Sequence, residues 1–194
     1  MHTRLAIVSI CVAVSLSILQ SRDSRASGIS APGMVPSESI AVPVAAARPE
    51  DVSSIDGIVK AFYEVISGPP GQPRQWSRDR TLYIPGVQFV AMNEDSAHHA
   101  TARAMTHQQL VDHYDAELVE NGFFEHEIHR KTERFGNIVH IFSTYESRYT
   151  ENGAVIARGV NSIELFWDGR RWWIVTAIWD EERADNPMPK ELLP

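Results

Sequence analysis

The chain has 194 residues, of which 43% are hydrophobic and 22% are charged, and its formal net charge is −7. This mixture is typical of one globular domain with a tail, and it excludes a wholly disordered, collagen-like or multi-span membrane protein. The acidic balance argues against a nucleic-acid partner, and a single cysteine excludes an intrachain disulfide bond.

The first 26 residues have the pattern of a secretory signal peptide. A basic start precedes an apolar run over residues 5–19, and a small-x-small pattern predicts cleavage after Ala26. A retained membrane anchor is the alternative, but the run is shorter than the ~20 residues that span a bilayer. Lipidation of Cys11 is a further alternative, which the large residue before it disfavours. We expect an exported protein in the bacterial periplasm or outside the cell, with no membrane contact after cleavage.

Two helices are expected at the start of the folded part, which we place at residues 51–194. Residues 27–50 are rich in Ser, Ala, Pro and Gly without periodicity, and they predict a disordered linker. Apolar residues at helical spacing predict a helix from Ser53 to about residue 66. A shorter helix is expected over residues 74–83, with Trp76 as its buried anchor.

The next segment predicts a strand, a loop and a third helix. Residues 87–91 alternate and predict a short strand, whereas residues 93–104 are small and polar and predict a mobile loop. Thr106 is a suitable N-cap for a helix that ends at Asn121-Gly122.

After Gly122 the hydrophobic period changes from 3.6 to 2, which predicts strands. Glycine-containing hairpin sequences separate four of them, at residues 123–133, 138–150, 155–167 and 172–181. The order ααβαββββ indicates an α+β fold in which three helices pack on one face of a curved antiparallel sheet. Three prolines make the last segment an extended tail.

Several local sequences carry a resemblance to a known family. They are Arg74-Gln75-Trp76, Gly122-Phe123-Phe124-Glu125, Phe142-Ser143-Thr144-Tyr145-Glu146-Ser147, Gly159-Val160-Asn161-Ser162 and Asp168-Gly169-Arg170-Arg171-Trp172-Trp173. Together with the element order they resemble an exported bacterial branch of the nuclear transport factor 2-like superfamily, which includes polyketide cyclase-like (SnoaL-like) proteins, ketosteroid isomerase and scytalone dehydratase. The resemblance implies a cystatin-like cone with a pocket on the concave sheet face, and a homodimer through the outer face.

Strand alternation predicts which side chains line that pocket. A tight turn at Gly136 places Glu133 opposite Ile138 and His126 opposite Tyr145, subject to strand register. The expected pocket residues come from two helices and four strands, and they are Phe62, Tyr63, Trp76, Tyr83, His126, Ser143, Tyr145, Asn161, Trp173 and Trp179.

His126 and Asn161 are the candidate catalytic residues. The resemblance to ketosteroid isomerase places the catalytic base of that enzyme near Ala91, which cannot take a proton. It places the acid of the oxyanion hole near Asn161, whose amide can donate a hydrogen bond. His126 can replace the base from another wall, and the alternative is a structural role in the core. Glu125, Glu127 and Glu133 are expected on a solvated face.

Three functions stay open from the sequence. The first is binding of a small apolar or carbonyl-containing molecule, the second a cofactor-independent lyase or isomerase, and the third a dimeric interaction module with a filled pocket. Histidine spacing predicts no metal site, and no cofactor is expected. Trp172 and Trp173 point to opposite sheet faces, so Trp172 predicts an apolar outer face and a homodimer. The alternative is a surface Trp172 that an arginine stem shields.

Overall fold

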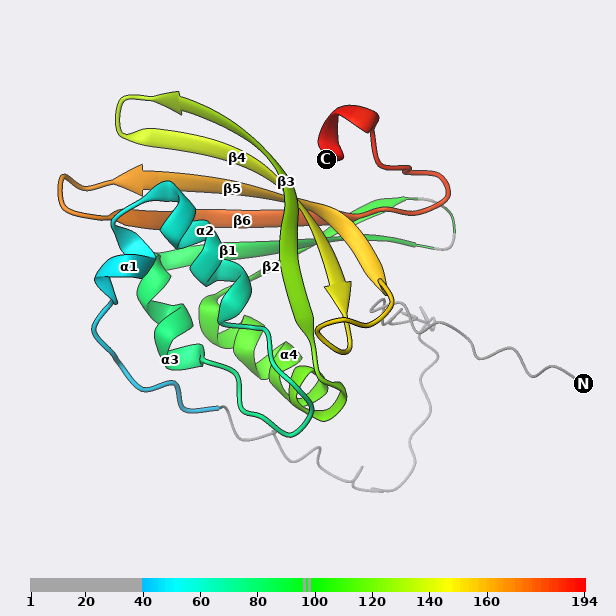
Figure 1. Ribbon diagram of the computed structural model, residues 1–194, viewed down its shortest axis with the longest axis horizontal. Coiled ribbons are helices and arrows are strands. Elements are labelled where there is room, and N and C mark those ends of the chain that lie inside the picture. The colour runs from blue at the N-terminus through cyan, green and yellow to red at the C-terminus, as the bar shows by residue number, and fades with distance from the viewer. Residues whose placement is uncertain (1–39, 96, 98) are drawn as a thin grey trace, which may run out of the picture.

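Six strands form one strongly curved sheet, and helices cover its concave side (Figure 1). The structure, a computed structural model, describes residues 40–95, 97 and 99–194. The expected signal peptide, and the expected linker as far as residue 39, lie outside the described residues. The expected α+β architecture is confirmed.

The helices are short except for the last. They are α1 (Pro49–Val52), α2 (Ile55–Glu64), α3 (Trp76–Asp79), the 3-10 turn η1 (Arg80–Leu82) and α4 (His107–Asn121). Ser54 caps α2, one residue later than expected, because its hydroxyl accepts a hydrogen bond from the Gly57 amide at 2.9 Å. The expected cap of α4 is confirmed, and Thr106 and Gln109 form a reciprocal capping box there. None of the described helices is long and apolar enough to cross a membrane.

The strands follow the order β2-β1-β6-β5-β4-β3 across the sheet. Their bounds are β1 (Tyr83–Glu94), β2 (Ala100–Met105), β3 (Phe124–Phe135), β4 (Ile138–Arg148), β5 (Ala157–Trp167) and β6 (Trp172–Glu181). The expected antiparallel meander is confirmed for β3 to β6. The expectation of an entirely antiparallel sheet was wrong, because β1 pairs with β6 in parallel. After α4 the chain enters at the far edge with β3, and three hairpins bring β6 beside β1 in the same direction.

β2 replaces part of the expected loop at residues 93–104. It pairs antiparallel with β1 from Phe89↔Met105 to Glu94↔Ala100. All of its residues except Met105 are exposed, so the strand has no buried face to produce an alternating pattern. A strand without a hydrophobic face leaves no period-2 signal in the sequence.

The ordered part of the chain begins before residue 51. The amide of Ile40 donates to Asp112 of α4 at 2.9 Å, and Ser77 of α3 donates to the Pro43 carbonyl at 3.0 Å. Ile40 and Val42 also pack against a small cluster formed by Trp76, Val111 and Leu118. We call residues 40–44 the N-terminal strap. The described end of the expected linker is therefore attached to the outer side of α3 and α4.

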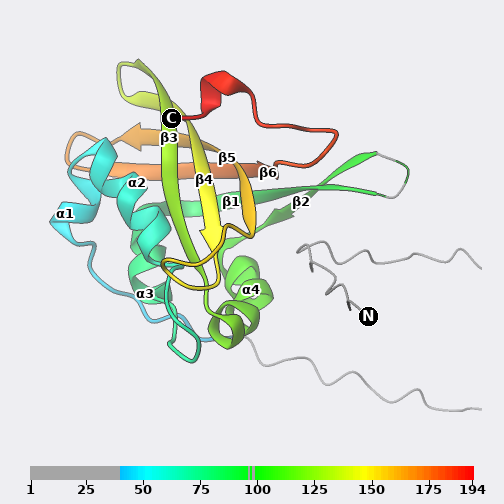
Figure 2. The same ribbon diagram turned by 45° about the vertical axis from the view of Figure 1, so that its right-hand side comes forward.

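The C-terminal segment turns back over the outer face of the sheet (Figure 2). It ends in a 3-10 turn, η2 (Lys190–Leu192), and the Thr144 hydroxyl donates to the Leu192 carbonyl at 2.7 Å. The tail therefore occupies one part of the convex face over β3 and β4.

Candidate functional site

A cavity of about 350 Å³ lies between the concave sheet face and helices α2, α3 and α4. This volume is within the range of ~300–1,000 Å³ that is usual for small-molecule pockets. The walls are mostly apolar, and they are formed by Phe62, Ile66, Trp76, Tyr83, Phe89, Leu110, Tyr114, Leu118, Phe123 and Trp179.

A cluster of four polar residues lies on the sheet wall of this cavity, where β3, β4 and β5 lie side by side. Its members are Glu125, Tyr145, Ser147 and Asn161. The Ser147 hydroxyl donates to the Glu125 carboxylate at 2.7 Å. Neighbouring strands therefore place a carboxylate, a phenol and an amide together in an apolar surrounding.

The Tyr145 hydroxyl has no hydrogen-bond partner among the residues that the structure describes, and its oxygen is not among the buried polar atoms that lack a partner, so it is open to the cavity. Only 4% of the residue is exposed, yet it lines the cavity. Gly159 makes room for it, because a Cβ atom at that position would lie 2.5 Å from the Tyr145 oxygen. A hydroxyl that faces a cavity without a protein partner can donate and accept hydrogen bonds, so it can orient a ligand that carries a matching group.

The pKa of Glu125 is raised to about 7, by burial first and by the nearby Glu181 carboxylate, while hydrogen bonds from Ser147 and Asn161 oppose the shift. Burial also raises the pKa of Glu181, with a contribution from Asp180. The pKa of Tyr145 is raised by burial first and by Glu125 second. Glu125 can therefore give or take a proton near neutral pH.

A second network supports the wall from behind. Asn161 donates to the Tyr63 hydroxyl at 3.1 Å, and the Tyr63 and Ser143 hydroxyls are 2.6 Å apart. Ser143 in turn donates to Glu127, which also accepts hydrogen bonds from Nε and Nη2 of the Arg130 guanidinium. This network fixes the direction of the Asn161 amide at the cavity wall.

The structure distributes the ten expected pocket residues among three environments. Six of them line the cavity: Phe62, Trp76, Tyr83, Tyr145, Asn161 and Trp179. Tyr63 and Ser143 are buried directly behind the wall, in the network just described. His126 and Trp173 lie on the other face of the sheet. That any of these residues contacts a ligand remains a prediction.

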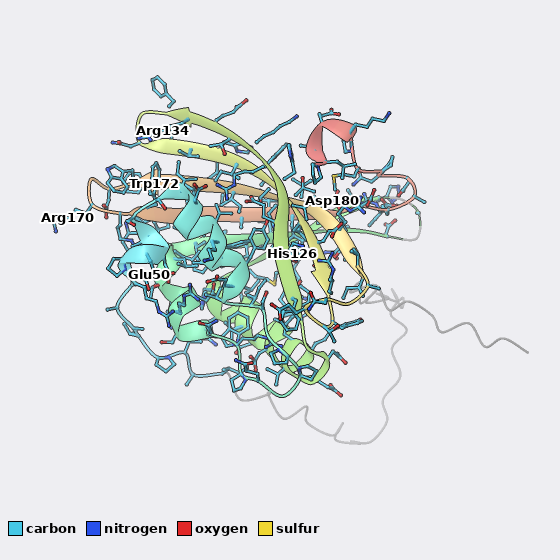
Figure 3. The ribbon with its side chains drawn as sticks, viewed as in Figure 1. Glu50, His126, Arg134, Arg170, Trp172 and Asp180 are labelled. Atoms are coloured by element: carbon cyan, nitrogen blue, oxygen red, sulfur yellow. The ribbon has the colours of Figure 1, made fainter. Side chains whose placement is uncertain are left out.

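The placement of His126 was wrong because β3 contains a bulge between Glu127 and His129. Tyr145 lies opposite Glu127 instead, and His126 lies opposite Glu146 on the convex face. The exposed His126 ring lies 2.9 Å from an Arg148 nitrogen, and Figure 3 shows it on β3. A side chain on this face cannot act as a base in the cavity.

Because of the same bulge, the expectation that Glu125, Glu127 and Glu133 share one solvent-exposed face was wrong. Glu125 and Glu127 face inward, and only Glu133, on the other side of the bulge, is exposed on the convex face. Sequence reasoning therefore missed Glu125, which is the strongest acid–base candidate of the site. The sequence did contain a signal, because Glu125 and Glu127 alternate with His126. If His126 faces outward after a one-residue shift in register, both glutamates face inward.

A second bulge, in β6, places the adjacent Trp172 and Trp173 on the sheet faces opposite to those expected from the sequence. The pairs Ile163↔Ala177 and Leu165↔Ile174 leave one extra residue in β6, so Trp172 faces inward. Trp172 is 5% exposed and lies near α1 and α2 in Figure 3. Trp173 faces outward, where the Arg171 guanidinium lies 3.6 Å from its ring and its indole donates to Asp168 at 2.7 Å. Both expected positions were wrong, and the arginine shield considered for Trp172 belongs to Trp173.

A curved sheet with helices on its concave side, closed around a cavity, is the cone expected from the family resemblance. The chain has the nuclear transport factor 2-like fold. Neither a protein-family model nor a curated protein matches the sequence.

Among solved structures, the chain is similar to two NTF2-like proteins of unknown function. One is from Shewanella baltica, with 12% identity and a TM-score of 0.43, and the match covers 67% of this chain and 92% of that one. The other is from Silicibacter pomeroyi, with 13% identity and a TM-score of 0.43, and it covers 67% and 94%. The assignment of the fold rests on the architecture of the chain itself.

Proposed function

We propose that this nuclear transport factor 2-like protein binds a small, largely apolar molecule in the cavity. The observation that carries the proposal is the Tyr145 hydroxyl, which is open to the cavity without a described partner and shares a mostly apolar wall with Glu125. Apolar walls supply most of the binding free energy, and a few polar groups orient the ligand. The cavity has a free volume of about 350 Å³. This free volume argues against the alternative function, an interaction module in which the protein's own side chains fill the pocket.

Native mass spectrometry of the protein purified from a bacterial periplasm tests the proposal. We expect a bound small molecule that is lost on denaturation, and a denatured mass that lacks residues 1–26, since we also propose export with cleavage after Ala26. Ala91→Leu extends a buried side chain of β1 into the cavity, so the adduct should disappear. Ala102→Leu, at an exposed position of β2, is the matched control and should keep it. An adduct that survives Ala91→Leu contradicts the assignment of the cavity.

A second candidate function is a cofactor-independent lyase or isomerase that acts on a small carbonyl compound. The pKa of Glu125 favours it, because a carboxyl with a pKa of about 7 can act as a base or an acid at neutral pH. Glu125 replaces His126 as the proposed base, and the Asn161 amide remains a possible donor to a developing oxyanion. Turnover of a bound compound that Glu125→Gln abolishes, with binding retained, would favour catalysis over binding alone.

We also propose a homodimer through the convex face, although Trp172 no longer supports it. Five large apolar side chains of this face are exposed: Phe135, Ile138, Phe142, Phe166 and Ile178. Strand pairing places Phe135, Ile138 and Phe166 in one row across the sheet and Phe142 and Ile178 in another, with the row that contains His140 and Glu164 between them. Lys131 and Glu133 lie at the edge of the same face, so two copies can pair opposite charges across a twofold axis.

Light scattering during gel filtration measures this association. Phe142→Asp is expected to convert a dimer into a monomer, because it places a carboxylate at the centre of the apolar rows. Val155→Asp is the matched control, since Val155 is 42% exposed but lies in the loop between β4 and β5. A wild-type protein that is monomeric at micromolar concentration refutes the homodimer.

A further inference from the structure

The charged residues that line the cavity are mostly acidic. Of the described lining residues, five are carboxylates and one is an arginine: Glu94, Glu125, Asp180, Glu181, Glu182 and Arg183. The arginine is already paired, because its guanidinium lies 3.0 Å from Glu94 and 2.7 Å from Asp180. It therefore leaves part of the negative charge uncompensated.

Glu125 and Glu181 carry that excess. Neither forms an ion pair with any residue in the described part of the chain. Glu181 is the charged group that acts on Glu125, and Arg183 and Asp180 act in turn on Glu181. The other neighbours of Glu125 are the neutral Ser147, Asn161 and Tyr145. Carboxylates in a cavity with low-dielectric walls create a negative electrostatic potential there, so a cation gains free energy by entering it.

The remaining wall suits an organic cation. Phe62, Trp76, Tyr114 and Trp179 present aromatic rings to the cavity, and ring faces attract cations. The unpartnered Tyr145 oxygen can accept a hydrogen bond from an N–H group. The described carboxylates do not converge with other side chains into a group that could hold a metal ion. The cation that fits is therefore a protonated amine on an apolar body.

We propose that the cavity selects a small apolar amine, whose ammonium group pairs with the Glu125 carboxylate and donates to the Tyr145 oxygen. The inference rests on the proposed ligand-binding function and names the ligand class of the same site. Glu181 also lines the cavity, and its carboxylate adds to the attraction of the cation. The apolar body of the amine occupies the space between Phe62, Trp76 and Trp179.

Three matched probes test the selection by titration calorimetry at pH 8: phenethylamine, the neutral 2-phenylethanol and the anionic phenylacetate. We expect phenethylamine to bind at least about tenfold more tightly than 2-phenylethanol, and phenylacetate to bind most weakly. Glu125→Gln should abolish the preference for phenethylamine over 2-phenylethanol. Glu133→Gln removes an exposed carboxylate of the same strand, and it should preserve the preference.

Lowering the pH from 8 to 6 should reduce the preference, since protonation of Glu125, whose pKa is about 7, removes the carboxylate. Equal affinities for the amine and the alcohol overturn the inference and leave the ligand-binding proposal standing. A preference that survives Glu125→Gln also overturns it. If none of the three probes binds, the amine inference fails, and the native mass spectrum of Ala91→Leu decides the ligand-binding proposal separately.

Discussion

Glu125→Gln is expected to stabilise the protein at pH 8 by up to about 3 kcal/mol. The carboxyl has a pKa of about 7 in the folded protein, against 4.5 for an ordinary glutamate. The folded state therefore binds this proton more tightly than the unfolded state. Its contribution to stability is complete below pH 4.5 and is lost as the pH rises through 7. Glutamine keeps the shape of the protonated side chain and has no charge to bury.

Urea unfolding between pH 4 and pH 9 measures this effect. The free energy of unfolding of the wild type should fall as the pH rises from 4.5 to 7. Glu125→Gln should remove most of this pH dependence. Some slope should remain, because the pKa of Glu181 is raised as well. Glu133→Gln, on the exposed face of β3, should follow the wild-type curve. Parallel curves for wild type and Glu125→Gln would show that the carboxylate is solvated in the folded protein.

The second large effect is expected at Asp79, where Ala should cost about 3–5 kcal/mol of stability. Asp79 is completely buried at the end of α3. It accepts hydrogen bonds from the Tyr83 hydroxyl at 2.5 Å and from His107 Nε2 at 2.8 Å. Its removal leaves both groups buried without a partner, which costs more than a net hydrogen bond contributes. Because His107 is the first residue of α4, the position of this helix depends on the same carboxylate.

Thermal and urea unfolding compare this variant with Asp56→Ala. Asp56 also forms a short ion pair, at 2.6 Å to Arg130, but its side chain is 91% exposed. The exposed pair should contribute less than about 1 kcal/mol. The structure thus predicts a large difference between two aspartates with similar contacts. Equal losses for the two variants would contradict a buried role for Asp79.

The strands in which inward and outward side chains alternate regularly were predictable from the sequence. In the cavity wall, two strands depart from this alternation at bulges. β4 and β5 pair without a bulge over their whole length, so Tyr145 and Asn161 face the side that alternation predicts. β3 and β6 each contain one extra residue, which reverses the face of every side chain beyond it. A bulge is fixed by the pairing of two strands in space. The inward position of Glu125 and the outward position of Trp173 therefore required the structure.

The cap at Thr106 and the hairpin turns were also predictable, because they depend on a few neighbouring residues. β2 was not, because its side chains bury almost nothing and its existence depends on pairing with β1. The site thus combines two strands that the sequence specifies locally with one, β3, whose register depends on distant contacts.

The N-terminal strap has a practical consequence for work on the isolated domain. Trp76 and Leu118 contact the strap and also line the cavity, so the same two side chains separate residues 40–42 from the site. A fragment that begins at residue 51 would expose the back of this wall to water and leave it supported from one side. A fragment that keeps both sides of this cavity wall supported therefore starts no later than Ile40.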